Sequence, residues 1–87
     1  MVLLDLLGQR WTLRIIWELR SERLSFRPLR AQCDDVSPTV LNTRLKALRE
    51  FGIVDLDEDG YGLTRAGREL GVQLAALDGW ARRWIKA

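Results

Sequence analysis

Val36-Ser-Pro-Thr-Val-Leu-Asn-Thr-Arg-Leu-Lys-Ala-Leu-Arg-Glu-Phe-Gly52 is the stretch that decides the fold, because it predicts a helix with clear ends. Ser37 is a good N-cap, since its hydroxyl can accept a hydrogen bond from a free backbone N–H of the first turn. Pro38 suits the first helical position, where its missing N–H costs nothing. Gly52 can adopt the left-handed conformation that ends a helix.

The two sides of this predicted helix differ in character. Leu41, Leu45 and Leu48 recur at i, i+4 and i+7 and form one apolar stripe. The opposite side is polar and mostly basic, which suits a helix that lies in a DNA major groove. An ordinary solvated surface helix has the same character, so the rest of the chain must decide. The residues of this side are Thr39, Asn42, Thr43, Lys46 and, toward one edge, Arg49.

Length and composition predict one globular domain over residues 1–87. Of the 87 residues, 47% are hydrophobic, and four are tryptophans. A domain of this size has only a marginal core of its own. The high apolar content therefore also suggests that a partner chain completes part of the surface.

Charge is unevenly distributed around a net value of +2. Residues 8–49 carry nine bases and four acids, residues 50–64 carry five acids and no base, and residues 65–87 carry five bases and two acids. A basic half beside an acidic patch is compatible with nucleic-acid binding but does not require it.

The sequence contains no histidine and one cysteine, Cys33. This excludes metal sites built on His/Cys clusters, Cys–His nucleophiles and disulfides within one chain, and we expect neither metal nor cofactor. We expect Cys33 to be a small buried hydrophobe, with a reactive thiol as the alternative. A single thiol fits a reducing compartment. Because no apolar run approaches the roughly 20 residues of a membrane span and no signal peptide is evident, we expect a soluble cytoplasmic protein.

Two helical segments are predicted at the start of the chain. Residues 1–7 predict a leucine-rich helical turn that Gly8 ends. Residues 10–20 predict a second helix, with Thr12 as its cap. Its apolar positions are Leu13, Ile16, Trp17 and Leu19, and its exposed positions are Arg14, Glu18 and Arg20.

The next segments predict a helix-turn-helix. Residues 24–26 have the pattern of a very short strand, and residues 26–33 predict a third helix that has Pro28 in its first turn. Only residues 34–36 then separate this helix from the opening stretch. Two helices joined by so short a turn, the second of them well capped, form a helix-turn-helix.

After Gly52 the apolar period changes from 3.6 to 2. Residues 53–57 and 61–63 alternate as strands around a turn at residues 58–60, which predicts a small hairpin, the wing of a winged helix. A long terminal helix follows over residues 65–85, with Thr64 as its cap. Its apolar residues step by 4, 3, 4 and 3, which is typical of a heptad seam. These residues are Leu70, Leu74, Leu77, Ala81 and Trp84.

These elements predict a mainly α fold with a small β-hairpin, a winged helix-turn-helix that dimerises through its first and last helices. In this order they resemble the HxlR-type winged helix-turn-helix transcription regulators of bacteria and archaea. Any one matching segment alone is weak support for the resemblance, but together the segments span nearly the whole chain. The segments are Leu6-Leu-Gly-Gln-Arg-Trp-Thr-Leu13, Phe26-Arg-Pro-Leu29, Val36-Ser-Pro with Leu41, Arg44-Leu45, Leu48 and Gly52-Ile-Val54, and Tyr61-Gly-Leu-Thr-Arg-Ala-Gly67.

The resemblance implies a homodimer that binds operator DNA, with the helix over residues 37–51 in the major groove. Two features depart from the family. Some members sense oxidants or electrophiles with a cysteine just before the first helix, but no cysteine stands there in this sequence, so we do not expect redox sensing to carry over. The family's wing is often longer and basic, whereas this one is acidic, and phosphates would repel it. The wing can instead contact a protein partner or lie away from DNA. Its acids are Asp55, Asp57, Glu58 and Asp59.

Roles can be assigned to the polar side of the opening helix. Asn42 and Thr43 can contact base edges, and Asn is best suited to adenine. Lys46 and Arg49 can contact phosphates. The full set of candidate DNA-binding residues is Ser37, Thr39, Asn42, Thr43, Arg44, Lys46, Arg49, Arg27 and Arg30.

Three of these arginines have an alternative role. Arg44 flanks the apolar stripe, where an intradomain ion pair and a phosphate contact are equal alternatives. Arg27 and Arg30, on the preceding helix, can bind the DNA backbone or simply be exposed to solvent. The candidate dimer interface comprises Leu3, Leu4, Leu7, Leu70, Leu74, Leu77, Ala81 and Trp84, and the tryptophans are expected in the core and in this interface.

The sequence thus predicts a prokaryotic, sequence-specific DNA-binding transcription regulator that acts as a homodimer on a near-palindromic operator. The alternative is a winged-helix protein-interaction module that binds no DNA. An enzyme is not expected, because the sequence offers no plausible acid, base or nucleophile set. Double-stranded DNA and a second copy of the chain are the expected partners, with no membrane partner. The sequence does not indicate an effector ligand.

Overall fold

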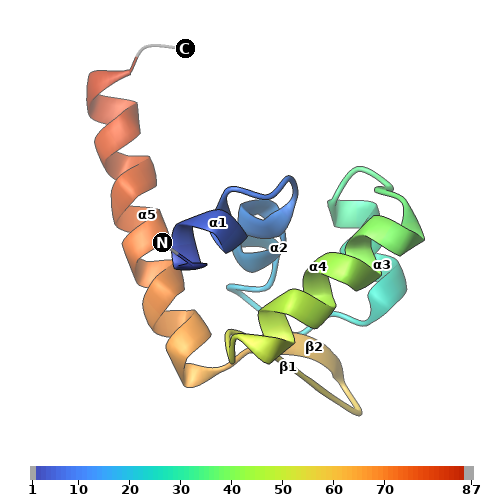
Figure 1. The fold of residues 1–87 in the computed structure, drawn as a ribbon. Helices are drawn as coiled ribbons and strands as arrows, with labels where there is room; N and C mark the ends of the chain where they lie inside the picture. The colour runs from blue at the N-terminus through green and yellow to red at the C-terminus, as the bar shows by residue number, and fades with distance from the viewer. Residues whose placement is uncertain (1, 86–87) are drawn as a thin grey trace.

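The computed structural model describes residues 2–85, which form five helices and one antiparallel hairpin (Figure 1). The predicted fold class, mainly helical with a small β-hairpin, is confirmed. Met1, predicted as the start of the first helix, lies outside the described residues. No helix within the described range is long and apolar enough to cross a membrane. The elements are α1 (Val2–Leu7), α2 (Thr12–Glu18), α3 (Phe26–Gln32), α4 (Pro38–Glu50), β1 (Val54–Asp57), β2 (Gly60–Leu63) and α5 (Arg65–Trp84).

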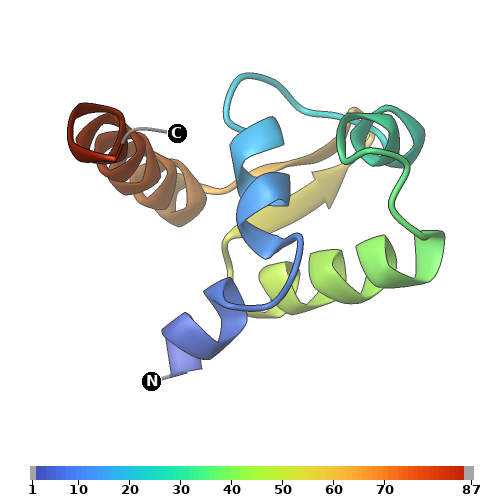
Figure 2. The same cartoon turned by 90° about the horizontal axis from the view of Figure 1, so that it is seen from above.

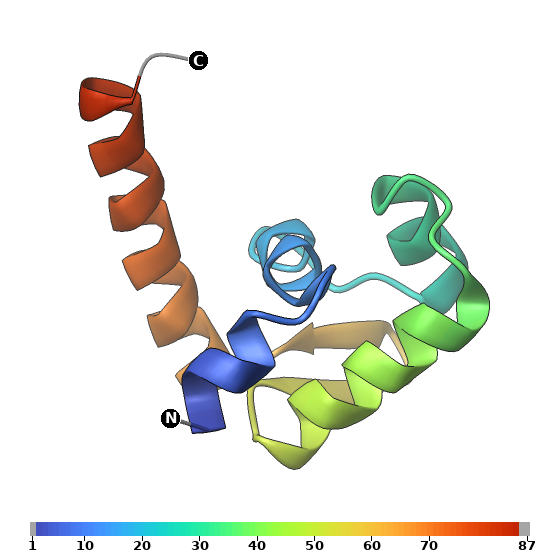
Figure 3. The same cartoon turned by 45° about the horizontal axis from the view of Figure 1, so that its top comes forward.

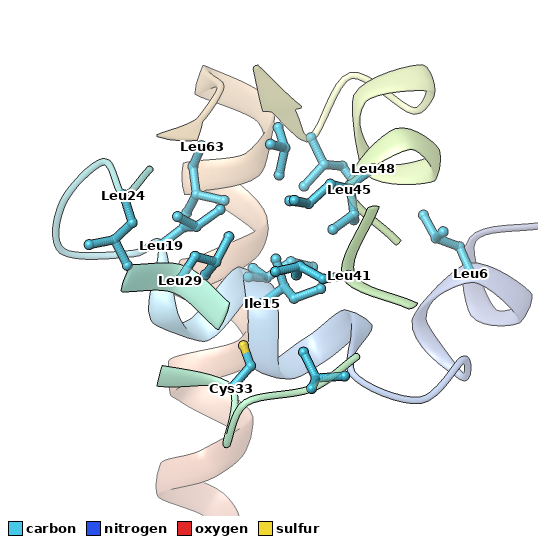
Figure 4. Packing of buried hydrophobic residues seen from close by; sticks show 14 residues of the cluster. Leu6, Ile15, Leu19, Leu24, Leu29, Cys33, Leu41, Leu45, Leu48 and Leu63 are labelled. Atoms are coloured by element: carbon cyan, nitrogen blue, oxygen red, sulfur yellow. The ribbon is translucent and has the colours of Figure 1, made fainter. Parts of the chain in front are cut away.

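Helix α2 lies at the centre of the domain and packs against α1, α3 and α5. Its Ile15 and Ile16 are fully buried. Figure 4 shows leucines from the surrounding elements converging on this centre, with the sulfur of Cys33 at one edge. Burial of this apolar surface is the main force that holds the short helices together, since helices of six or seven residues are not stable alone. The core comprises Leu6, Ile15, Ile16, Leu19, Leu24, Leu29, Cys33, Val36, Leu41, Leu45, Leu48, Ile53, Val54 and Leu63.

The start of α2 differs from the prediction. Trp11, not Thr12, is the N-cap residue, and it adopts a left-handed backbone with φ of 77°. Thr12 is the first helical residue and is fully buried, so its hydroxyl does not cap the helix. Ile16 and Leu19 are buried as predicted, but Leu13 is 44% exposed, and the buried Ile15 was not predicted. Tertiary packing against α1 and α3 decided both points.

The segment before α3 is also shorter than predicted. Leu24 forms a single antiparallel bridge to Tyr61 rather than a strand over residues 24–26. Phe26 already belongs to α3, and Cys33 follows its last residue as the C-cap. The bridge still matters, because it ties the chain before α3 to the second strand of the wing.

The hairpin pairs β1 with β2 in a register that sets Val54 opposite Leu63 and Asp57 opposite Gly60. Gly60, predicted as a turn residue, is the first residue of β2, and its φ of 111° is unfavourable for any other residue. Ile53 precedes β1 instead of opening it. The hairpin lies against the C-terminal part of α4, as the view in Figure 3 shows.

Helix α5 begins as predicted, because the Thr64 hydroxyl accepts a hydrogen bond of 3.1 Å from the Gly67 N–H. The helix runs along one side of the domain, and α3 and α4 lie on the other, with α2 between them (Figures 1 and 2). It packs on α2 and β2. Its second half extends beyond the other helices (Figures 1 and 3).

Candidate nucleic-acid interface

Helix α4 has the ends and the faces that the sequence predicts. The Ser37 hydroxyl accepts a hydrogen bond of 3.1 Å from the Val40 N–H, and Pro38 is the first helical residue. At the other end Gly52 adopts a φ of 76°, the left-handed conformation of a helix stop. Leu41, Leu45 and Leu48 are at most 1% exposed and fix the helix to the core.

Burial of this stripe turns the polar side of α4 toward solvent. Within residues 2–85, the side chains of Asn42, Lys46 and Arg49 are exposed and make no hydrogen bond or ion pair. Thr43 is exposed as well, and its hydroxyl donates to the Thr39 carbonyl oxygen at 2.9 Å. All five predicted residues of the polar side therefore lie on one solvent-facing surface, and four of them, all but Thr43, have side-chain polar groups without a partner among residues 2–85.

The wing borders this surface. Asn42, Lys46 and Arg49 line a shallow hollow of about 330 Å³ together with Tyr61 of β2. Lys46 and Arg49 also line a second hollow, whose far wall includes Leu56 of β1. Whatever binds along the polar side of α4 therefore also lies beside the hairpin.

Arg44 forms a contact that is neither of the two predicted for it, an intradomain ion pair or a DNA phosphate. Its Nε donates to the carbonyl oxygen of Arg10 at 2.8 Å, so it ties α4 to the loop that connects α1 and α2. This acceptor is a backbone carbonyl, and Arg44 forms no ion pair with any acid between residues 2 and 85. Its guanidinium remains half-exposed, and a phosphate contact stays a prediction.

Arg30 is used to build the turn between α3 and α4. Asp34 and Asp35 both adopt left-handed backbone, with φ of 57° and 56°. Asp tolerates this conformation better than most residues. The Arg30 Nε donates to the Val36 carbonyl at 2.7 Å, and its Nη2 donates to the Asp35 carbonyl at 3.3 Å. Arg30 thus braces the turn that sets α4 against α3, whereas Arg27 is exposed.

Two arginines that the sequence did not single out join distant parts of the chain. Arg14 donates from Nε to Glu18 at 2.7 Å and from Nη2 to the Gln32 carbonyl at 2.6 Å, so it links α2 to the end of α3. Its hydrogen bond to Glu18 raises the pKa of Arg14. Arg23 reaches the wing and pairs with Asp55 and Asp57. Only the Arg14–Glu18 spacing of four residues was visible in the sequence.

Cys33 is fully buried, as predicted. Burial raises the pKa of its thiol, because an apolar surrounding disfavours the thiolate. The neutral thiol is unreactive compared with a thiolate. Among residues 2–85 the acids also form no cluster of three that could hold a metal ion.

The predicted dimer residues fall into two groups. Leu7, Leu70 and Leu74 are half-buried because they already pack against the core of their own chain. The exposed group carries large apolar side chains that this chain leaves uncovered. It comprises Leu3 at 36%, Leu4 at 59%, Leu77 at 60% and Trp84 at 72% exposure, and Ala81 is intermediate.

The tryptophans divide in the same way. Trp11 packs against the core, and Trp17 is half-buried with the Arg20 guanidinium stacked 3.7 Å from its ring centre. Trp80 and Trp84, in the extended half of α5, are 47% and 72% exposed. Of the four tryptophans, Trp11 packs against the core cluster, whereas Trp17 lines a surface hollow between α2 and α5.

The sequence model of the HxlR-like helix-turn-helix family matches residues 6–87, which is nearly the whole chain. The chain belongs to the HxlR family. It is a DNA-binding transcription regulator with the winged helix-turn-helix fold, as the sequence predicted. Family members are transcription regulators, a class that is generally not enzymatic.

Named relatives and solved structures agree with this assignment. The HTH-type transcriptional regulator YvaP of Bacillus subtilis is 32% identical over 93% of the chain and 82% of YvaP. A Mycobacterium tuberculosis HTH-type regulator is 33% identical, and the chain spans 56% of its length. Quinone-bound YodB from B. subtilis superposes with a TM-score of 0.88 at 29% identity, over 95% of this chain and 94% of YodB. A possible HxlR-family transcription factor from Thermoplasma volcanium superposes with a TM-score of 0.82 at 31% identity, over 91% of this chain and 77% of that factor.

Proposed function

We propose that two copies of this HxlR-family chain bind a near-palindromic operator, each with α4 in a major groove. The observation that supports this is the polar side of α4. Its Asn42, Lys46 and Arg49 side chains are exposed beside one another and make no bond to another described residue. Free donors on a basic helix face suit base edges and phosphates.

The roles within this face follow from side-chain chemistry. Asn42 presents an amide that can pair with an adenine edge, and Thr43 lies beside it with its methyl group and hydroxyl. Lys46 and Arg49 are flexible cations near the C-terminal end of α4, next to the wing, where they would meet phosphates. Ser37 and Thr39 would contact the backbone at the other end of the helix.

The homodimer would form through the apolar residues that a single chain leaves exposed. In the extended half of α5 these are Leu77 and Trp84, and in α1 they are Leu3 and Leu4. Large exposed apolar side chains of this kind mark association surfaces. A two-fold dimer would set the two α4 helices about 34 Å apart, one turn of DNA.

The regulation we propose requires no chemical step. Occupancy of the operator would block or alter transcription of a neighbouring gene. Because the relatives from Bacillus subtilis and Mycobacterium tuberculosis are bacterial regulators and bacterial DNA lies in the cytoplasm, the protein would act there. Double-stranded DNA and a second copy are the partners in this proposal.

The experiment has two stages. Selection of bound duplexes from random DNA should return a sequence with two-fold symmetry and half-sites about 10 bp apart. Titration of that duplex at rising salt should then show a steep loss of affinity, because released counterions drive phosphate binding. Flat salt dependence, or no binding at low salt, contradicts the proposal and favours a protein-interaction module.

Two substitutions test the division of roles. Lys46→Ala should weaken binding to every sequence and lower the slope of log K against log salt by about 1. Asn42→Ala should cost about 1–3 kcal/mol, mainly at one base position. Arg65→Ala removes the same charge as Lys46→Ala from an exposed site on α5 and should leave the slope nearly unchanged. Equal behaviour of the Asn42 and Lys46 variants would refute the assignment.

A further inference from the structure

The Arg23 side chain lies against the wing. Its Nη2 donates to the Asp55 carboxylate at 2.5 Å and to the Gly60 carbonyl at 2.8 Å, and its Nε lies 3.0 Å from the Asp57 carboxylate. These contacts join the turn after α2 to both strands of the hairpin. The pairing raises the pKa of Arg23, first through the hydrogen bond to Asp55.

The register of the hairpin makes room for this arginine. Asp55 lies directly opposite Gly62, and Asp57 lies opposite Gly60. A Cβ at Gly62 would overlap the Arg23 guanidinium, at 2.7 Å from its Cζ. A Cβ at Gly60 would lie 2.6 Å from the Leu24 carbonyl. Gly62 therefore leaves room for the Arg23 side chain, and Gly60 leaves room for the backbone of Leu24.

The contacts of Arg23 with Asp55 and Asp57 lie on one face of the wing. Successive side chains of a strand point to opposite faces, so Asp55 and Asp57 share one face while Val54 and Leu56 share the other. Leu56 is paired with Tyr61, and both border the hollows beside α4. Both aspartates pair with Arg23, and Asp55 also lines the hollow that contains Lys46 and Arg49.

We infer that Arg23 is a positioning residue for DNA binding. It pairs with two carboxylates of the acidic wing, of which Asp55 lines the hollow shared with Lys46 and Arg49, and it cancels one of their two negative charges. The wing can then lie beside phosphates that its aspartates would otherwise repel. This inference rests on the proposed function, and it concerns Arg23 acting through Asp55 and Asp57 rather than a direct contact with DNA.

The test compares four proteins on the selected operator: wild type, Arg23→Gln, Arg23→Lys, and Arg23→Gln combined with Asp55→Asn and Asp57→Asn. Arg23→Gln should raise the dissociation constant about threefold to tenfold at low salt, because it leaves both carboxylates unpaired near the DNA. Arg23→Lys keeps the charge and should lose less. The triple variant should bind about as tightly as wild type.

Salt separates this role from a purely structural one. Salt screens exposed charges, and the screening length is roughly 10 Å at 0.1 M. The loss of DNA affinity caused by Arg23→Gln should therefore become smaller when the salt concentration is raised from about 50 to about 300 mM. A loosened wing alone would leave a defect that persists at high salt and in the triple variant. A triple variant that binds no better than Arg23→Gln therefore overturns the inference.

Two further results keep the test decisive. Circular dichroism shows whether Arg23→Gln folds. If it does not, the test uses a variant that keeps Arg23 and carries Asp55→Asn and Asp57→Asn. That variant should bind DNA more tightly than wild type, and unchanged or weaker binding overturns the inference. Wild-type protein that fails to bind DNA at low salt instead refutes the proposed function, and this is seen before any variant is made.

Discussion

Gly67 offers a prediction whose sign runs against helix propensity. Alanine normally stabilises a helix by about 1 kcal/mol relative to glycine. At position 67 of α5, however, a Cβ would lie well inside 3.0 Å of the Ile53 carbonyl oxygen and 3.1 Å from its carbonyl carbon. Both atoms are backbone, and the Ile53 carbonyl also accepts hydrogen bonds from the Thr64 N–H and hydroxyl. Neither partner can move without breaking the junction between the wing and α5.

The expected magnitude follows from these two opposing terms. Forcing an extra methyl group into packed structure costs typically 1–3 kcal/mol and more where backbone must shift. We therefore expect Gly67→Ala to lose about 2 kcal/mol net, which for a domain of this size lowers the melting temperature by roughly 8–16 °C. Thermal unfolding followed by circular dichroism at fixed protein concentration measures this.

Gly71 provides the matched control on the same helix. A Cβ there would lie 3.8 Å from a Leu63 methyl group, an ordinary van der Waals contact. Gly71→Ala should therefore raise stability by up to about 1 kcal/mol. If Gly67→Ala melts at or above the wild-type temperature, the close approach of α5 to Ile53 is refuted.

Three other perturbations have expected outcomes. Ser37→Ala should destabilise the protein by about 1 kcal/mol in denaturant titration, and Ser37→Gly by only a few tenths, because the hydroxyl caps α4; equal losses would contradict the cap. Since burial raises the pKa of Cys33, a thiol reagent at pH 8 should modify the folded protein far more slowly than the unfolded one. As pH rises, the Cys33 thiol loses its proton in the unfolded chain before it does so in the folded protein. Its contribution to the free energy of unfolding should therefore be fully present below about pH 8.5 and decrease above it. Fast modification of the folded protein by the thiol reagent would disprove burial. Leu77→Glu with Trp84→Glu should fold yet sediment as a monomer without operator affinity, because both side chains are exposed in the single chain; a dimer that still binds would exclude this part of α5 from the interface.

Two acids of the wing have partners within the domain. Of its four carboxylates, Asp55 and Asp57 pair with Arg23. The Asp57 carboxylate also accepts a hydrogen bond of 2.8 Å from the Asp59 N–H, so it helps to shape the turn. Asp55 and Asp57 thus have a structural role within the domain.

The sequence by itself determined the features that depend on near neighbours. The Ser37 cap, the Gly52 stop, the leucine stripe of α4 and the Thr64 cap each involve residues within one or two turns of helix. Local hydrogen bonding and helical periodicity therefore specify them directly. The polar side of α4 could be predicted for the same reason, since burying one side of a helix exposes the other.

The tertiary structure decided which of those polar residues remain free. Arg44 bonds to a carbonyl 34 positions away, and Arg23 bonds to Asp55 across 32 positions. Leu70 and Leu74, predicted in a dimer seam, are partly covered by their own core. Sequence spacing contains no signal for such contacts, because they exist only once packing has brought distant segments together. Packing left the side chains of Asn42, Lys46 and Arg49 without partners among the residues that the structure describes, and the DNA contacts that we propose depend on this.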